Sequence, residues 1–532
     1  MPRVLVSDPI AEAGIERMRG YADVDVRTGL SARELADAIA SYDALAVRSE
    51  TKVTAEVLAR ATRLRIIGRA GVGVDNIDVR AATEAGILVV NSPQGNTIAA
   101  AELTVAMLLA LARSIPQADA SLRSGRWERK RFLGTQVYGK TLGIVGLGKI
   151  GAEVARRARG LEMTVMTYDP YATEEIARQC GASLVSLDEL YAAGDFITVH
   201  VPLNDETRGM VGAEQIARMK PGVRIVNCAR GGLIDEVALA EAIRGGHVAA
   251  AAFDVFSQEP PAPANPLLGL PNVIVTPHLG ASTEEAQVNV AVDIAEQIGD
   301  VLRGRPARSA VNMPSLSAEA LDAARPYLKL AECIGSLHTQ LARDLDGRGR
   351  PIEAVEVLYQ GDFGVVPTGP LTRAVLAGML APTLSYPVNL VNAPVLAAQR
   401  GIRVTESHTT AHHEYVALVT VRARTPAGQR EVCGAVFARG DLRIVHIDDY
   451  RVDIAPEGTM LLTQHIDRPG MIGAVGTLLG SNHVNIAGMN VGREKVGGRA
   501  LMVLMVDDEI GADLLQQIRA LPGMETARLV RF

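Results

Sequence analysis

The run Gly146-Leu147-Gly148-Lys149-Ile150-Gly151 constrains the fold of this 532-residue chain more than any other feature of the sequence. It follows the buried run TLGIV and opens a helical stretch around AEVARRAR. Glycines at this spacing are a weak signal alone, but between a strand and a helix they are typical of a doubly wound α/β sheet. The sequence therefore predicts a strand–turn–helix unit at this point.

A carboxylate at the end of the next predicted strand extends this pattern. Asp169 ends the run TVMTYD, 18 residues after Gly151. In such units the glycines admit a pyrophosphate, the helix N-terminus attracts its charge, and the carboxylate accepts the ribose hydroxyls. The pattern predicts a dinucleotide site that favours NAD over NADP, because Asp169 would repel a 2′-phosphate. The alternative is a tight strand–helix turn that binds no ligand.

Strand-like and helical runs alternate on both sides of this motif. The later series predicts a doubly wound sheet, with strands at 141–146, 164–169, 196–201, 223–228, 251–256 and 273–277. The earlier series predicts a second parallel sheet, with strands at 3–7, 43–48, 64–68 and 87–91 and a helix at 54–61. A long helical pattern covers 96–125 and another covers 282–304, so the later unit looks inserted into the earlier one. We expect one domain at 1–96 with 282–310 and a second at 97–281.

The pattern of the sequence changes after VNMP (311–314). Residues 318–344 are helical in pattern, and 415–454 hold strand-like runs with turns at 425–429 and 438–441, which predicts an antiparallel meander. No catalytic motif lies between 313 and 455. The order of elements in 457–532 is β-α-β-β-α-β, which is typical of a ferredoxin-like domain.

Composition and cysteine spacing exclude several classes of function. Lys and Arg total 54 against 60 Asp and Glu, and aromatic residues make up only 4%, which argues against a general nucleic-acid binder. The four cysteines are too far apart for a zinc site, so we expect no metal and free buried thiols. The first residues read as a strand rather than a signal peptide, and the apolar stretch 98–112 is too short for a membrane span. These features indicate a soluble cytoplasmic protein.

Three segments at the ends of predicted strands each carry an ionisable residue that suits hydride-transfer chemistry. They are CARGG with Arg230, DVFSQEP with Glu259 and TPHLGAST with His278. Removal of a hydride from a secondary alcohol needs a base for the hydroxyl proton, and a His–Glu pair suits that task. Arginine suits the binding of a carboxylate. Each residue also has a structural alternative, since Glu259 precedes a proline and a lone histidine is often structural.

These blocks resemble those of the NAD-dependent D-2-hydroxyacid dehydrogenases. The resemblance covers the whole chain and is carried by GRAGVGVDNID (68–78), NCARGGLIDE (227–236) and PHLGASTEEAQ (277–287). It is greatest with the long members of the family, in which an intervening regulatory domain, here 313–455, and an ACT domain, here 457–532, follow the catalytic part. It implies a doubly wound Rossmann domain inserted in a flavodoxin-like substrate domain, then an α+β intervening domain and a ferredoxin-like ACT domain.

The resemblance also implies site residues. Arg230 and Glu259 would be catalytic, and His278 would be the acid/base. Residues that would bind NAD are Gly146, Gly148, Lys149, Ile150, Gly151, Asp169, Val201, Cys228, Ala229, Arg230, Asp254, His278, Gly280 and Ala281. Val72 and Val201 stand where relatives carry threonines, so only backbone contacts transfer to them.

The reaction that the resemblance implies is oxidation of 3-phospho-D-glycerate to 3-phosphohydroxypyruvate, the first step of L-serine biosynthesis. Arg48 and Arg69 end strands that face the predicted cleft, and the family uses such arginines for phosphate. Backbone N–H groups of Gly71, Val72 and Gly73 can form an anion-binding concavity. Asn96 is a further expected contact.

The last domain is expected to bind L-serine between two subunits, through His465, Asp467 and Asn485. Asp467 precedes a predicted helix, so it could equally be only the N-cap of that helix. The resemblance implies a homo-oligomer, a tetramer. Two other readings stay open: a reductase for glyoxylate, hydroxypyruvate or another D-2-hydroxyacid, and a non-catalytic NAD-sensing regulator.

Overall fold

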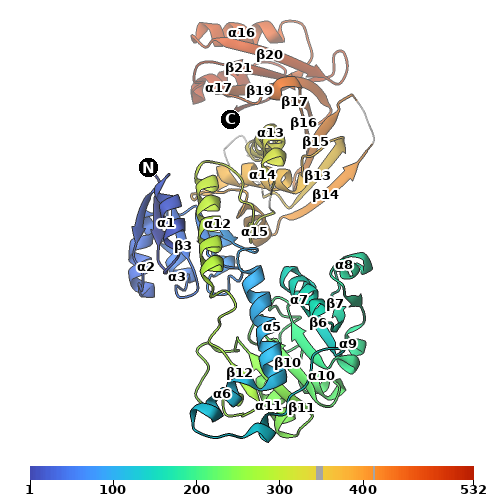
Figure 1. Ribbon diagram of the computed structural model, residues 1–532. Coiled ribbons are helices and arrows are strands. Elements are labelled where there is room, and N and C mark those ends of the chain that lie inside the picture. Colours follow the sequence, from blue (N-terminus) through green and yellow to red (C-terminus); the bar gives the residue numbers. More distant parts are fainter. Residues whose placement is uncertain (315, 343–350, 411–413) are drawn as a thin grey trace.

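The computed structural model describes residues 1–314, 316–342, 351–410 and 414–532. Within these ranges the chain forms four β-sheets that follow one another along the sequence. Figure 1 shows the first two sheets as separate bodies joined by long helices, and the last two packed together at the carboxyl end of the chain.

The first unit is a parallel five-stranded sheet with helices on both faces. The strand order is β2-β1-β3-β4-β5, which is the flavodoxin-like order that we expected. The strands are β1 (Arg3–Val6), β2 (Asp23–Val26), β3 (Ala44–Val47), β4 (Ile66–Arg69) and β5 (Leu88–Asn91). Apolar side chains of α1 (Glu12–Arg19) and α12 (Glu284–Leu302) pack on one face. Those of α2 (Ala32–Ala38), α3 (Ala55–Ala59) and α4 (Val79–Glu84) pack on the other.

The second unit is a parallel seven-stranded sheet of order β12-β11-β10-β9-β6-β7-β8. The order in which the strands are added reverses between β6 and β9, as in a Rossmann fold, and ligands bind at such a switch point. The strands are β6 (Thr141–Val145), β7 (Thr164–Tyr168), β8 (Ser183–Leu184), β9 (Phe196–Val199), β10 (Val223–Asn227), β11 (Val248–Phe253) and β12 (Val273–Val275). The predicted strand at 251–256 therefore ends early, and Asp254 lies beyond it.

Helices cover both faces of this second sheet. One face packs against α5 (Thr97–Arg113), α7 (Lys149–Gly160) and α8 (Glu174–Gln179). The other packs against α9 (Leu187–Ala193), α10 (Ala213–Arg218) and α11 (Glu236–Arg244). The helical pattern predicted through residue 125 is broken at Ser114, whose φ of +49° ends α5 before α6 (Ile115–Arg123) begins.

The chain passes between the two units twice, and a long helix follows each passage. The first passage leads from β5 into α5, and the second leads from β12 into α12 (Figure 1). Helix α12 packs on the first sheet and α5 on the second. Residues at the carboxyl ends of β3, β4 and β12 line the space between the units.

A third, six-stranded sheet follows, of order β14-β13-β15-β16-β17-β18. The antiparallel meander is confirmed and comprises β15 (Ala417–Thr425), β16 (Gly428–Val436), β17 (Leu442–Ile447) and β18 (Tyr450–Ile454). The sequence did not predict the parallel pair β13 (Ala354–Gly361) and β14 (Arg403–Thr409). Helices α13 (Ala318–Ala342), α14 (Thr368–Leu380) and α15 (Ala393–Gln399) complete this part.

The fourth sheet has the predicted β-α-β-β-α-β order of elements, with strands arranged β20-β21-β19-β22. Its elements are β19 (Thr459–Ile466), α16 (Met471–Ser481), β20 (Ile486–Arg493), β21 (Arg499–Val506), α17 (Ala512–Arg519) and β22 (Met524–Arg531). One face packs on its own two helices. The other shares a continuous core with α13, through Leu462, Val503 and Val530.

Short 3-10 helices connect several elements, at Ile39–Ser41, Arg129–Phe132, Ala381–Thr383 and Ala438–Gly440. Across the described ranges, no single helix has both the length and the apolar character needed to cross a membrane. The bent pair α5 and α6, with 61° between the two helices, meets that test by length and composition only.

Candidate active site

The glycine turn at the switch point of the second sheet is built for close backbone approach. Gly146 has φ of +97°, a conformation that favours glycine. A Cβ on Gly151 would overlap the carbonyl oxygen of Gly146, whereas Gly148 has open space beside it. The turn leads directly into α7, which begins at Lys149. Open backbone at the N-terminus of a helix fits the pyrophosphate of a dinucleotide.

Asp169 lies beside this turn, immediately after β7. One carboxylate oxygen accepts the N–H of Leu147 at 2.8 Å, and the other accepts the N–H of Tyr171 at 2.8 Å. These bonds fix the carboxylate next to the glycines. Because a carboxylate oxygen has two lone pairs, each oxygen can still accept a ribose hydroxyl.

The other predicted cofactor residues differ in what their side chains can contribute. Val201 packs over Gly146. The thiol of Cys228 points into the core, 3.4 Å from the sulfur of Met107, and burial raises its pKa to about 12. At Cys228, therefore, only the backbone can face a ligand.

Asp254 has a structural task that the sequence did not reveal. Its buried carboxylate accepts the N–H groups of Leu279 at 2.7 Å and Gly280 at 2.8 Å. It also accepts the hydroxyl of Thr276 at 2.6 Å. Asp254 therefore shapes the loop that carries His278, whose own N–H donates to the Asp254 carbonyl oxygen at 2.9 Å.

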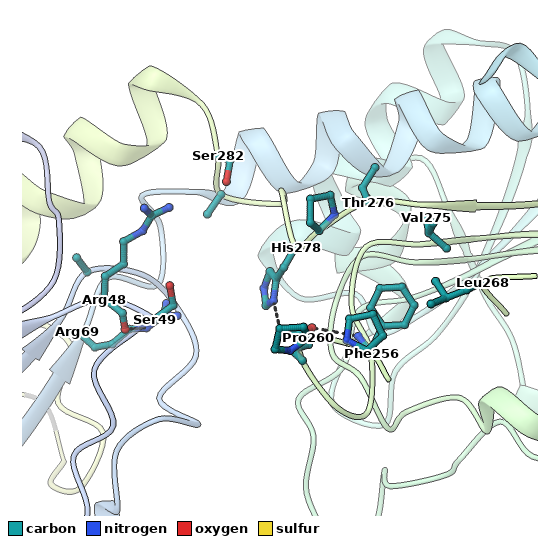
Figure 2. Close-up of a pocket in the computed structure, with 15 residues that line it drawn as sticks. Arg48, Ser49, Arg69, Phe256, Pro260, Leu268, Val275, Thr276, His278 and Ser282 are labelled. Atoms are coloured by element: carbon teal, nitrogen blue, oxygen red, sulfur yellow. Dashed lines mark hydrogen bonds and ion pairs between the residues drawn. The ribbon is translucent and has the colours of Figure 1, made fainter. Parts of the chain in front are cut away.

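The structure brings His278 and Glu259 together. The distance from His278 Nδ1 to Glu259 Oε2 is 2.7 Å, and Glu259 Oε1 accepts the N–H of Phe256 at 3.0 Å. Burial favours the neutral carboxyl, but these hydrogen bonds outweigh it and hold the pKa of Glu259 below its ordinary value. With Nδ1 engaged, Nε2 is the nitrogen left to meet a substrate (Figure 2).

A cleft of about 640 Å³ lies between the two units. Figure 2 shows Arg48 and Arg69 of the first unit on one side of it and His278 of the second on the other. The N–H of Arg48 donates to Asp8 at 2.6 Å, and the side chain of Arg69 donates to the carbonyl oxygen of Arg48 at 3.2 Å. Burial, with a smaller effect from the charge of Arg230, lowers the pKa of Arg69 to about 10.

Sequence reasoning did not identify the apolar wall of this cleft. Phe256, Leu268 and Val275 line it beside the His–Glu pair. Apolar residues in loops and at a strand end do not indicate a binding site in the sequence, because only the fold shows that they line the cleft.

The remaining predicted substrate residues surround the cleft rather than line it. Gly71 has φ of +148°, and a Cβ there would overlap the guanidinium of Arg69. A Cβ on Gly73 would overlap the guanidinium of Arg230. Asn96 is the N-cap residue of α5 but makes no side-chain cap, and its buried Oδ1 has no hydrogen-bond partner in the described structure.

The residues predicted to bind serine do not meet within one chain. Asp467 follows β19 and accepts the N–H of Gly497, whereas Asn485 precedes β20 and donates to Asp507. β21 pairs with the two strands so that these residues lie at its opposite ends, ~27 Å apart for eight residues at about 3.4 Å each. The buried Nδ1 of His465 has no partner among the described residues.

The alternative reading of Asp467 as a helix N-cap is wrong. The N-cap of α16 is Gly470, and the helix begins at Met471. The four cysteines are buried and free. Among the described residues, no group of three or more His, Cys, Asp or Glu side chains could hold a metal ion.

Comparison with known proteins gives three family matches along the chain. Residues 105–280 match the NAD-binding domain of the D-isomer specific 2-hydroxyacid dehydrogenases. Residues 323–448 match the D-3-phosphoglycerate dehydrogenase intervening domain, and 459–523 match the ACT domain.

Full-length relatives and solved structures agree with these matches. The D-3-phosphoglycerate dehydrogenase of Synechocystis is 50% identical and covers 100% of this chain and 95% of its own length. That of Archaeoglobus fulgidus is 47% identical, with 99% of each chain covered. The TT0316 protein from Thermus thermophilus has a TM-score of 0.54 and 37% identity, over 58% of this chain and 99% of its own. The chain belongs to the D-3-phosphoglycerate dehydrogenases of the D-2-hydroxyacid dehydrogenase family.

Proposed function

We propose that the protein oxidises 3-phospho-D-glycerate to 3-phosphohydroxypyruvate with NAD, the first step of L-serine biosynthesis. The observation that carries the proposal is the cleft, which places a His–Glu pair opposite two arginines. A substrate that is both a 2-hydroxyacid and a phosphate needs a base at one end and cations at the other. The full-length relatives named D-3-phosphoglycerate dehydrogenase support the same conclusion.

The proton of the substrate hydroxyl would go to His278. Its Nδ1 is held by Glu259 at 2.7 Å, so Nε2 is free to accept that proton. The carboxylate of Glu259 then stabilises the imidazolium that forms. NAD, when bound at the glycine turn and Asp169, supplies the hydride acceptor.

Charge in the cleft would orient the two anionic ends of the substrate. Arg230 follows β10, and its guanidinium can bind the carboxylate through two parallel N–H bonds. Arg48 and Arg69 lie on the opposite side, where the phosphate would bind. The apolar wall beside His278 excludes water from the reacting carbon.

We assign these tasks to the expected domains. Residues 1–96 with 282–310 bind substrate and 97–281 bind NAD. Residues 313–455 and 457–532 are regulatory. The shared core of α13 and the last sheet supports their acting as one body.

Formation of NADH by the purified full-length protein tests the function. We expect turnover with 3-phospho-D-glycerate and much weaker turnover with D-glycerate. Preference for glyoxylate or hydroxypyruvate as the oxidant of NADH would instead favour a general reductase. Binding of NAD without turnover of any of these would favour a sensing role.

We infer that L-serine binds the last domain at a site made by two copies of the chain. Within one copy Asp467 and Asn485 lie at opposite ends of β21, so a ligand that touches both must take them from different copies. Such an arrangement needs a homo-oligomer, and a tetramer fits the family.

Binding of L-serine should therefore weaken in two variants that act at different places. Asp467→Ala and Asn485→Ala should each raise the Kd in calorimetry while leaving KM for NAD unchanged. Mixing the two variants should restore some sites with both native residues in the same interface. Absence of serine binding to the wild-type oligomer at millimolar concentration would refute the assignment.

A further inference from the structure

One acidic side chain of the first unit contacts Arg230 of the second unit. Asp75 lies in the loop between β4 and α4 of the first unit, and its Oδ2 is 3.3 Å from Arg230 Nε in the second unit. The Asp75 side chain is 69% exposed, whereas that of Arg230 is 27% exposed. The contact therefore joins a solvent-facing carboxylate of one unit to a largely covered guanidinium of the other.

The position of Asp75 on the guanidinium matters for substrate binding. Nη1 of Arg230 donates to the carbonyl oxygen of Ala229 at 2.6 Å. Arg230 Nη2 and Asp75 Oδ2 both lie beside Gly73. A Cβ added to Gly73 would overlap Nη2 and would be 2.7 Å from Oδ2. The edge formed by Nε and Nη2 is thus the one that can take a carboxylate through two parallel bonds, and Asp75 lies at that edge.

The surrounding charges explain why a carboxylate is stable there. The charges of Arg48 and Arg230 both repel that of Arg69, and Asp75 and Asp8 are the carboxylates whose charges oppose this repulsion. Asp8 already accepts the N–H groups of residues 48, 50 and 51. Asp75 has no comparable set of backbone bonds in the described structure, so it is the carboxylate that can leave.

We propose that Asp75 is a placeholder counter-ion, which holds Arg230 while the cleft is empty and gives way to the carboxylate of the substrate. The inference rests on the proposed function and deepens it. Each binding event exchanges one carboxylate for another at Arg230, so Asp75 weakens the binding of any ligand that brings a carboxylate there. A ligand that brings only phosphate does not compete with Asp75 for this edge.

The test is the variant Asp75→Asn, which keeps the size of the side chain and removes its charge. KM for 3-phospho-D-glycerate should fall about 2- to 5-fold, the range expected for an ion pair with an exposed partner. The value of kcat should stay within twofold, because Asp75 contacts neither His278 nor Glu259. Asp75→Glu retains the charge and should keep KM near the wild-type value.

Two controls separate the exchange of carboxylates at Arg230 from a general change in the electrostatic potential of the cleft. Glu50→Gln removes one negative charge from an exposed side chain in the loop after β3 and should leave KM unchanged. Inorganic phosphate, measured by calorimetry, should gain less affinity from Asp75→Asn than 3-phospho-D-glycerate does, because Asp75 contacts Arg230 directly and acts on Arg69 only through its charge. A similar gain for phosphate or in Glu50→Gln would overturn the placeholder role in favour of a general electrostatic effect.

The outcome also distinguishes this inference from the proposed function. If the wild type does not oxidise 3-phospho-D-glycerate, the function fails, and calorimetry with 3-phospho-D-glycerate and NAD still measures the exchange at Arg230. If the wild type turns over and Asp75→Asn has a raised or unchanged KM, the function stands and the placeholder is wrong. A raised KM with lowered kcat would instead make Asp75 a residue that positions Arg230 for catalysis.

Discussion

The hydrogen bond between Glu259 and His278 allows a quantitative prediction for the variant Glu259→Gln. The substitution preserves the shape of the side chain and removes its charge. The amide oxygen can still accept from His278 Nδ1, now 2.7 Å from the carboxylate. Hydrogen bonds to charged groups contribute about 1.5–3 kcal/mol and neutral ones about 0.5–1.5 kcal/mol, so the variant loses about 1–1.5 kcal/mol.

Exposure of the two side chains to water reduces this loss of free energy. The His278 and Glu259 side chains are 48% and 37% exposed, and water screens their interaction, so we expect a loss of about 1 kcal/mol. That loss corresponds to about a 5-fold decrease in kcat. The carboxylate favours the protonated imidazole, and oxidation needs the neutral one. Removing the charge should therefore move the acidic limb of the pH–rate profile to lower pH.

The assay is NADH formation from saturating 3-phospho-D-glycerate and NAD across the pH range in which the enzyme is stable. Glu241→Gln makes the same chemical change at an exposed position on α11 and should leave the profile unchanged. The reasoning is refuted if Glu259→Gln keeps both kcat and the acidic limb of the wild type, or if the limb moves to higher pH.

Three further variants test the other parts of the site. His278→Asn keeps a residue that tolerates φ of +55° but cannot act as a base, so kcat should fall ~10²–10⁴-fold with NAD binding little changed; a variant within threefold of wild type would contradict the role. Asp169→Asn retains an oxygen for the N–H of Leu147 but loses its charge. Calorimetry should then show weaker NAD binding and a narrower preference over NADP, and unchanged affinity for NAD would mean that Asp169 does not meet the ribose. Arg69→Ala should raise KM for 3-phospho-D-glycerate about 10- to 150-fold, the equivalent of ~1.5–3 kcal/mol, with a much smaller effect on D-glycerate. Equal effects on both substrates would assign Arg69 to the scaffold.

Strands with apolar runs were predictable from the sequence, including the edge strands β5 and β12, whereas the exposed edge strands β2 and β14 were not. The runs that became β3 and β4 are apolar on both faces, as expected of a covered parallel sheet. β2 and β14 lie at sheet edges, are largely exposed and carry polar side chains, so no apolar run marks them. The break between α5 and α6 was missed although Pro116, in the first turn of α6, marks it, because a proline inside a helical pattern indicates that a helix ends just before it.

The site was predictable where a local motif carries the chemistry. Short patterns at strand ends mark the glycine turn, Asp169, and the segments that carry Glu259 and His278. The fold then brings Glu259 and His278 into contact. The tasks of Asp254 and Asp75 depend on contacts between distant segments. An acidic residue in a loop carries no sign in the sequence that its partner is a backbone N–H or an arginine of another unit.

The most direct test of the central claim is an experimental structure of the protein with NAD and 3-phospho-D-glycerate. We predict the substrate carboxylate on Arg230, the phosphate on Arg48 and Arg69, and the hydroxyl within about 2.6–3.2 Å of His278 Nε2. Asp75 should have moved away from Arg230. A phosphate bound outside the two arginines, or a hydroxyl that His278 cannot reach, would contradict the account.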